Sequence, residues 1–285
     1  SFDAALSSAE IVIARDPSSI ETVDERVMDL AREDVIFPAV AAYLPSRPAP
    51  FPKTAAINLV EFEGMDVAEV ETKMADLVAA CEQHQGEPGW PMAWSVAKSD
   101  ADRNALWQLR AKGVGLLGNT KGRRKPVPFV EDTVVPPEKL AAYVAEFRAV
   151  LDAEGLTYGM FGHVDVGCLH VRPALDLRDP EDEARVRRIS DQVAALCTKY
   201  GGVIWGEHGK GFRSEYSPLH FGELFVHVEA VKTLFDPTER LNPGKIATPT
   251  GKRRHLATID QPTRGQQDRQ IARAAAREQA RPERD

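Results

Sequence analysis

The chain lacks several features that would assign it to a common class. Its 285 residues include only three cysteines, Cys81, Cys168 and Cys197, and no Cys-x-x-Cys. This spacing argues against a zinc ribbon or a cysteine-ligated iron–sulfur cluster. So few cysteines favour a reducing, cytoplasmic compartment. We also expect no membrane span and no secretory leader, because no apolar run approaches ~20 residues and the first residues lack a basic start.

Positive charge is scarce in most of the chain. The net charge of the chain is −7. Residues 251–285 carry +4, so residues 1–250 carry −11. An acidic body argues against nucleic acid as a partner, because phosphate binding needs a basic surface. We expect 251–285 to be a basic, flexible tail or linker.

Apolar periodicity predicts alternating strands and helices. Residues 1–15 are interpreted as an entry segment, and Ser18 with Glu21 resembles a capping box that would open a helix over 21–33. Five prolines predict an irregular loop over 34–53. Strands are expected over 54–64, 90–98, 126–136, 156–164 and 168–175, and helices over 66–84, 101–117 (capped by Ser99), 137–155 and 181–202.

This alternation indicates an α+β fold. We expect a mixed or antiparallel sheet with helices on one face, in a duplicated ferredoxin-like arrangement. The main domain would span 54–250, preceded by an entry segment and proline-rich loop over 1–53.

The stretch FGHVDVGCLHVRP (161–173) places two histidines around a tight turn. If the chain reverses at Val166 and Gly167, His163 pairs with His170 and both side chains lie on one face. Directly paired residues have Cβ atoms about 4.5–5.5 Å apart, close enough for two imidazoles to hold one ion. Cys168 is expected to face away. The alternative is a pair of core histidines with a structural role.

A second segment, VIWGEHGKGFRSEY (203–216), runs from a short strand into a turn with glycines on both sides of an acid and a histidine. Glycines allow a sharp bend and close approach. Glu207 together with the two histidines of the hairpin would form a three-ligand, zinc-type site with an open position. His208 would then be available as a proton acceptor. The alternative is an ordinary strand-to-loop turn.

GHVDVGCLH (162–170), GEHGKG (206–211) and FDPTERLNPGKI (235–246) together resemble a known family. They are similar to the C-terminal substrate domain of FAD-linked oxidases of the vanillyl-alcohol oxidase type, in the D-2-hydroxyacid dehydrogenase branch that includes D-lactate and D-2-hydroxyglutarate dehydrogenases. The resemblance covers roughly 54–250. Residues 1–50 look most like large bacterial members that carry an iron–sulfur domain as well.

The resemblance implies roles for the residues of the histidine segments. His163, His170 and Glu207 correspond to the family's divalent-metal ligands, with zinc the first expectation, and His208 corresponds to its catalytic base.

For cofactor and substrate, the resemblance implies that Asn242 packs against the flavin ring, with Gly206 and Gly209 also near the cofactor. Arg110 corresponds to the arginine that grips the substrate carboxylate, a task that suits a guanidinium.

The chain also departs from the family pattern. Val166 and Cys168 replace an Asp and an Asn of the family hairpin, so any polar role there is lost. The family's lysine before the middle-strand Asp falls near Val130, and we take Lys125 as its substitute in substrate binding.

The implied activity is oxidation of a D-2-hydroxy acid to the 2-oxo acid, with hydride transfer to N5 of FAD. No Gly-x-Gly-x-x-Gly opens a helix here, so we expect FAD to be held mainly by an N-terminal domain outside these residues. The chain would be the substrate half of a larger enzyme, cut at both ends. Its partners would be a small 2-hydroxy acid, the FAD-binding domain and a following iron–sulfur domain. Two alternatives stay open: a flavin-independent metal-dependent hydrolase or lyase, and a non-catalytic docking domain.

Overall fold

A computed structural model describes residues 1–44, 56–118, 122–209 and 211–259, and the structural statements below concern these residues. The helices are α1 (Phe2–Ile13), α2 (Glu25–Arg32), α3 (Phe37–Val40), α4 (Val67–Gln83), α5 (Asp100–Gly118), α6 (Leu140–Ala153), α7 (Pro180–Lys199), α8 (Ser217–Phe221) and α9 (Phe225–Phe235). The strands are β1 (Ser19–Val23), β2 (Ile57–Glu61), β3 (Lys125–Pro126), β4 (Thr133–Val134), β5 (Tyr158–His163) and β6 (Cys168–Leu175). Short 3-10 turns are η1 (Ala41–Tyr43), η2 (Pro137–Lys139), η3 (Gly211–Tyr216) and η4 (Gly222–Leu224).

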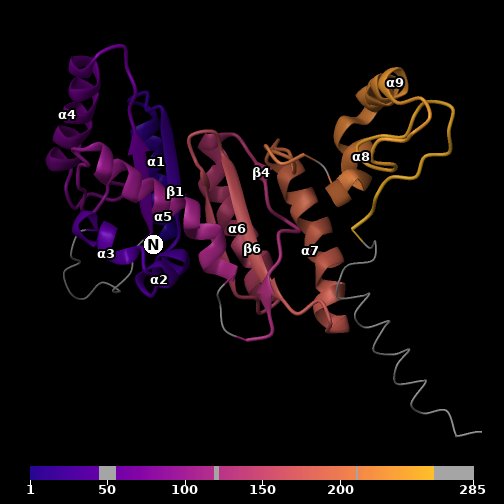
Figure 1. Cartoon of the computed structure of the whole chain (residues 1–285), viewed down its shortest axis with the longest axis horizontal. Coiled ribbons are helices and arrows are strands. Elements are labelled where there is room, and N and C mark those ends of the chain that lie inside the picture. Colours follow the sequence, from indigo (N-terminus) through magenta and orange to yellow (C-terminus); the bar gives the residue numbers. More distant parts are fainter. Residues whose placement is uncertain (45–55, 119–121, 210, 260–285) are drawn as a thin grey trace, which may run out of the picture.

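The strands form one antiparallel sheet in the order β2-β1-β5-β6-β3, with β4 also paired to β6 (Figure 1). This confirms the predicted α+β class with an antiparallel sheet. Val134 of β4 pairs with Cys168 on one side and bridges Val203 on the other. The units β4, α6, β5, β6, α7 and that bridge therefore follow the order of a ferredoxin-like motif. The first half of the chain repeats the central helix–strand–strand–helix part of this motif as α1, β1, β2 and α4.

Side-chain alternation divides the sheet into two faces. On one face, Ile20, Met160 and Leu169 join the main apolar core with residues of α1, α6 and α7. On the other face, Val23 and Phe161 pack against α2, α3 and α5 in a smaller cluster. Helices thus lie on both faces, and not on one as expected. The rest of the second face carries polar side chains, and these form the candidate site.

The N-terminal residues differ from the prediction. Ser18 and Glu21 are not a capping box, because residues 19–23 form β1, which pairs with both β2 and β5. The helix begins later, at Glu25, with Asp24 as its N-cap: the Asp24 carboxylate accepts a hydrogen bond from Val27 N at 2.8 Å. β1 therefore joins the N-terminal residues to the sheet, and the boundary predicted after residue 53 lies outside the described residues.

Two further segments depart from the expected elements. Residues 90–98 run as irregular chain where a strand was expected. The strand expected over 126–136 is present only as β3 and β4, since Asp132, just before β4, has a positive φ of 71°. The predicted tail lies outside the described residues from 260 onward. Among the residues that are described, no helix is long and apolar enough to cross a membrane.

Candidate active site

The β5–β6 hairpin places both predicted histidines on the same face, in a different register from the one expected. His163 lies opposite Cys168, and His170 lies opposite Phe161. The pairing is shifted by two residues from the predicted His163–His170 pair, and a shift of two preserves the face because side chains alternate with period two. The two imidazole centroids are 5.3 Å apart, with the rings nearly perpendicular.

Cys168 also lies on this face, contrary to the prediction, because it precedes His170 by two residues on the same strand. Its Sγ is 3.8 Å from Asp132 Oδ1. Burial, with the Asp132 carboxylate adding to it, raises the pKa of Cys168 to about 12. Without a metal ion beside it, the thiol is therefore protonated at neutral pH.

The Gly206–Gly209 turn reaches the histidines because its first glycine fits a narrow space. A Cβ on Gly206 would lie 2.6 Å from Val134 Cγ2 and 2.8 Å from Asp132 Oδ1. Gly209 has open space around it and serves the turn through its positive φ of 75°.

Asp132 fixes the position of this turn. Its carboxylate is wholly buried and accepts hydrogen bonds from Glu207 N at 2.8 Å and from His208 N at 3.0 Å. Its main-chain oxygen accepts a third from Gly206 N at 2.9 Å. Asp132 thus accepts hydrogen bonds from three successive N–H groups of the turn. It does so with a positive φ of 71°, which non-glycine residues seldom adopt.

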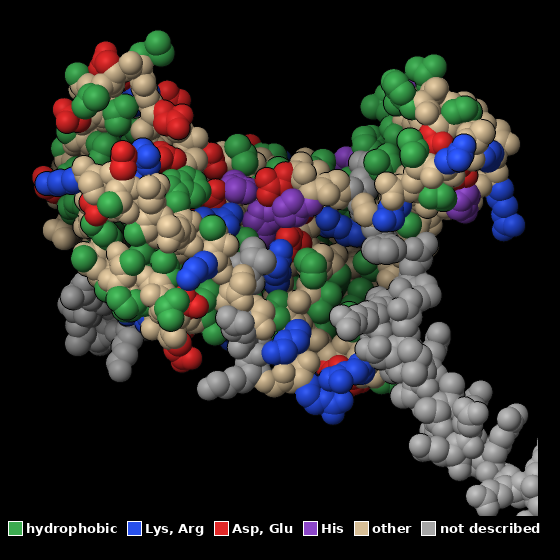
Figure 2. Space-filling view, viewed as in Figure 1, with side chains coloured by type: hydrophobic (Ala, Val, Ile, Leu, Met, Phe, Trp, Pro, Cys, Tyr) green, Lys and Arg blue, Asp and Glu red, His purple; other side chains and the backbone are tan. Residues whose placement is uncertain are grey.

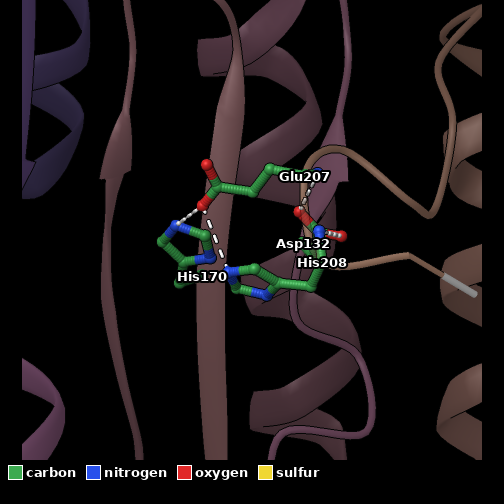
Figure 3. A group of neighbouring side chains, drawn as sticks. All are labelled: Asp132, His170, Glu207 and His208. Atoms are coloured by element: carbon green, nitrogen blue, oxygen red, sulfur yellow. Dashed lines mark hydrogen bonds and ion pairs between the residues drawn. The ribbon is translucent and has the colours of Figure 1, made fainter. Parts of the chain in front are cut away.

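Three imidazoles converge on one carboxylate oxygen. Glu207 Oε1 lies 3.3 Å from Nε2 of His163, 3.1 Å from Nε2 of His170 and 3.2 Å from Nε2 of His208. The His170 and His208 rings are stacked, with centroids 5.0 Å apart. Figure 3 shows the Glu207 carboxylate reaching over these two rings, with Asp132 beside the turn.

The site is closed at the back and open at the front. The His170 side chain is only 4% exposed, whereas those of Glu207 and His208 are 46% and 48% exposed. Figure 2 shows histidine side chains at the surface over the middle of the sheet, between acidic and basic groups and below the recess that separates α4 from the lobe of α8 and α9. A ligand can therefore approach the Nε2 atoms from one side.

This donor set suits a divalent cation. Asp132, His170, Glu207 and His208 each offer a ligand atom within 4.8 Å of the others. Both Asp132 oxygens already accept N–H groups, so its role is to hold the turn. His163 is outside this compact group, but its Nε2 approaches the same Glu207 oxygen. Imidazole nitrogens and a carboxylate are zinc-type donors, so the residues present fit the predicted ion.

Buried carboxylates tune the histidines. Glu21 Oε1 lies 2.5 Å from His163 Nδ1, and this hydrogen bond raises the pKa of His163. Burial would raise the pKa of Glu21, but hydrogen bonds from His163 and Arg110 outweigh it and hold that pKa below its usual value. Burial lowers the pKa of His170, which favours the neutral imidazole that a metal ligand requires.

The predicted substrate and cofactor residues are not all brought to this site. Arg110 of α5 is close, with its Nε 2.5 Å from Glu21 Oε2. Lys125 pairs with Leu175, five residues along β6 from His170, which is about 16 Å at the usual strand rise. The structure therefore does not bring Lys125 to the histidines.

Asn242 lies in the C-terminal lobe, exposed and with a positive φ of 47°. That lobe is joined to the chain after the histidine turn through η3, where the Ser214 hydroxyl accepts a hydrogen bond from Ile246 N at 2.9 Å.

Several residues of the site escaped sequence reasoning. Glu21, Glu131, Asp132 and Arg172 are all on or beside the polar face. The signal was present in PVPFVEDTVVP, where two adjacent acids interrupt an apolar run, and in SIETV, where an acid alternates with apolar residues. An acid in a half-buried strand requires a partner, so these positions were identifiable as candidates.

Comparison with known proteins identifies the relatives of the chain. Residues 1–246 match the family described as FAD linked oxidases, C-terminal domain. The chain is 49% identical over 276 residues to D-2-hydroxyglutarate dehydrogenase of Escherichia coli K12, and 47% identical over 272 residues to that of Pantoea ananatis. Each match covers 95% of this chain, but only 27% and 26% of those proteins. The chain thus spans about a quarter of the length of these relatives.

A solved structure shares the fold. The 4-ethylphenol oxidase of Gulosibacter chungangensis, in its isoeugenol complex, aligns with a TM-score of 0.55 over 87% of this chain and 52% of that one, at 14% identity. Together with the family match over 1–246 and the relatives at nearly half identity, this supports the resemblance found in the motifs. The chain belongs to the family of FAD linked oxidases, as their C-terminal domain.

Proposed function

We propose that this chain is the substrate-binding half of a flavin-dependent dehydrogenase that oxidises a D-2-hydroxy acid to the 2-oxo acid, with D-2-hydroxyglutarate the first candidate. The observation that carries the proposal is the convergence of three Nε2 atoms on Glu207 Oε1, on the open side of the site. The family match and the printed names of the relatives support it. They favour flavin chemistry over a flavin-independent hydrolase or lyase and over a docking domain.

His163, His170 and Glu207 would hold a divalent cation, with zinc preferred by the donor types. When bound, such an ion supplies a Lewis acid for the hydroxyl oxygen of the substrate. Buried His170 gives the site a fixed back wall, and exposed Glu207 leaves the front accessible.

His208 would accept the hydroxyl proton. Its side chain is half-exposed and lies at the front of the site, stacked on His170. Asp132 holds its main-chain N–H, so the imidazole is presented from a fixed turn. Histidine suits this role because it can exchange a proton near neutral pH.

Arg110 would bind the substrate carboxylate. Because its Nε is taken by Glu21 at 2.5 Å, a substrate would use the other edge of the guanidinium. The centroid of the adjoining Phe161 ring lies 4.8 Å from the guanidinium carbon, so this ring packs against the guanidinium group.

FAD, when bound, supplies the hydride acceptor. Asn242, Gly206 and Gly209 are the residues of this chain that we assign to the flavin side, with the FAD-binding domain of the parent chain as partner. The relatives are about four times as long, which leaves room for that domain and for an iron–sulfur domain. The three free, buried cysteines support a cytoplasmic location.

Two measurements test the proposal. Purified chain should carry near-stoichiometric divalent metal by mass spectrometry, and His170→Ala should lose it. The full-length protein containing this chain should reduce a dye with D-2-hydroxyglutarate, and His208→Ala should abolish this reduction while retaining the metal. Normal turnover in His208→Ala would contradict the assignment of the base.

A further inference from the structure

Each imidazole of the site has a buried carboxylate behind it, on the side away from Glu207. His163 Nδ1 lies 2.5 Å from Glu21 Oε1. His208 Nδ1 lies 3.4 Å from Glu131 Oε1, and His170 Nδ1 lies 4.0 Å from the same oxygen. The stacked rings of His170 and His208 are thus bracketed by two acids, with Glu207 at their Nε2 atoms and Glu131 at their Nδ1 atoms.

Both of these carboxylates are held by arginines. Glu21 accepts from Arg110 Nε at 2.5 Å, and Glu131 forms a two-pronged pair with Arg172, with Nη2 2.8 Å from Oε1 and Nε on the other oxygen. The side chains of both acids are only 5% exposed. A buried carboxylate without partners would be costly, and each of these two acids is paired with an arginine.

The two arginines lie against the same aromatic ring. The guanidinium carbons of Arg110 and Arg172 are 4.8 Å and 5.9 Å from the centroid of Phe161. Phe161 is directly opposite His170 in the sheet, and the two rings are 5.2 Å apart. One ring therefore packs against both arginines and one of the histidines, and ties the two ion pairs into a single rigid layer.

An ionised carboxylate can only accept hydrogen bonds. Glu21 Oε1 lies 2.5 Å from His163 Nδ1, whereas Glu207 Oε1 lies 3.3 Å from His163 Nε2, so the shorter contact places the proton on Nδ1. The opposite nitrogen then has a free lone pair. In metal sites, outer carboxylates of this kind fix the histidine tautomer and ring orientation, and their loss typically weakens metal binding 10–100-fold.

We propose that Arg110–Glu21 is a positioning pair that holds His163 with Nδ1 protonated, so that its Nε2 lone pair is directed into the site. This inference rests on the proposed function for the use of that lone pair, as a metal ligand. It also gives Arg110 a second role through its Nε, beyond the substrate contact proposed above.

The first test uses zinc alone as the probe. Zinc affinity of the 285-residue chain, measured by competition with a chromophoric chelator, should fall about 10–100-fold in Glu21→Gln. The matched control is Glu215→Gln, which removes a glutamate from another two-pronged arginine pair, with Arg187 at 3.0 and 3.1 Å, away from the histidines. It should leave zinc affinity unchanged. Thermal unfolding of each variant shows whether it folds.

The second test reads the tautomer directly. Histidine ¹⁵N NMR of the wild-type chain at alkaline pH should show His163 protonated at Nδ1, and Glu21→Gln should convert it to a mixture of tautomers. Protonation of His163 at Nε2 in the wild type overturns the proposal, as does unchanged zinc affinity in folded Glu21→Gln.

The two levels of proposal fail in different ways. A chain with the expected tautomer that binds no zinc, within a parent protein that oxidises no 2-hydroxy acid, contradicts the proposed function and not the positioning pair. A metal-dependent dehydrogenase with His163 protonated at Nε2 contradicts the positioning pair alone.

Discussion

The two faces of the β5–β6 hairpin differ completely although they belong to the same strands. One face presents Met160, Leu169 and Val171 to the main core, each at most 1% exposed. The other presents Phe161, His163 and His170, with arginines and glutamates around them. Because side chains alternate along each strand, one face of the hairpin contributes to the core and the other carries the candidate site.

The energetics of the faces differ as well. Burying a large aliphatic side chain contributes roughly 1.5–3 kcal/mol, so the apolar face favours folding at every position. On the polar face, burying Glu21 and Glu131 costs free energy, and the ion pairs with their arginine partners at most compensate for this cost. The comparison predicts that substitutions on the first face change stability, and that those on the second change binding.

The largest effect is expected for Leu169→Ala on the apolar face. Leu169 is wholly buried in the main core, and loss of its side chain should lower the free energy of unfolding by about 2–5 kcal/mol. Urea unfolding of the chain measures this change. Zinc affinity of the folded variant should stay at the wild-type value, because the side chain points away from the histidines.

The neighbouring position provides the converse test. His170→Ala should abolish zinc binding and change stability less than Leu169→Ala does. If both variants lost stability and zinc affinity to the same extent, the two faces would not be separable.

Asp24 tests a buried acid that lies outside the site. Its carboxylate accepts from Val27 N and from Met160 N, and burial raises its pKa to about 6. An acid whose pKa is higher in the folded state stabilises below its unfolded pKa, 3.8, and this contribution is lost as pH rises through 6. Stability should therefore fall by about 2 kcal/mol between pH 4 and pH 7.

The check is the same pH series on Asp24→Asn. This variant keeps an N-cap side chain and removes the titration, so its stability should be flatter over that range, relative to wild type. Parallel pH profiles would show that Asp24 is ionised in the folded chain throughout.

The glycines of the histidine turn offer a matched pair with a smaller effect. Gly206→Ala places a methyl group 2.6 Å from Val134 Cγ2, and should cost about 1–3 kcal/mol and weaken zinc binding by displacing the turn. Gly209→Ala meets open space, so only its positive φ is strained, at about 1–2 kcal/mol. Zinc affinity in the second variant should be closer to wild type, and a reversed order would contradict the role given to Gly206.

The sequence predicts the site well where local periodicity decides, and poorly where distant segments decide. Period-two alternation placed His163 and His170 on one face even though the register was wrong by two residues, since the turn begins two residues earlier than predicted, directly after His163. The strand at 19–23 was missed because Ser18 and Glu21 have the spacing of a helix cap, and only pairing with β2 and β5 reveals β1.

The partners of the supporting acids could not be predicted for the same reason. Glu21 meets His163 across 142 positions of sequence, and Glu131 meets Arg172 across 41. Such contacts follow from sheet order, which no single segment encodes. The glycine-flanked Glu207–His208 turn was identifiable because its chemistry and its bend lie in one short stretch.

The smallest effect is expected for Lys125→Ala. This variant tests the substrate-binding role predicted for Lys125 from the sequence against its position far from the histidines. Lys125 is exposed on β3 at the far end of β6 from His170, so its loss should change stability by no more than about 0.5 kcal/mol. It should also leave the KM of the full-length protein for a D-2-hydroxy acid unchanged. Arg110→Lys is the contrasting variant: it keeps the charge and loses the planar fork, so KM should rise. A large rise in KM for Lys125→Ala with no change for Arg110→Lys would mean that the substrate carboxylate binds toward β3, and the polar face would then extend along β6 well beyond the histidines.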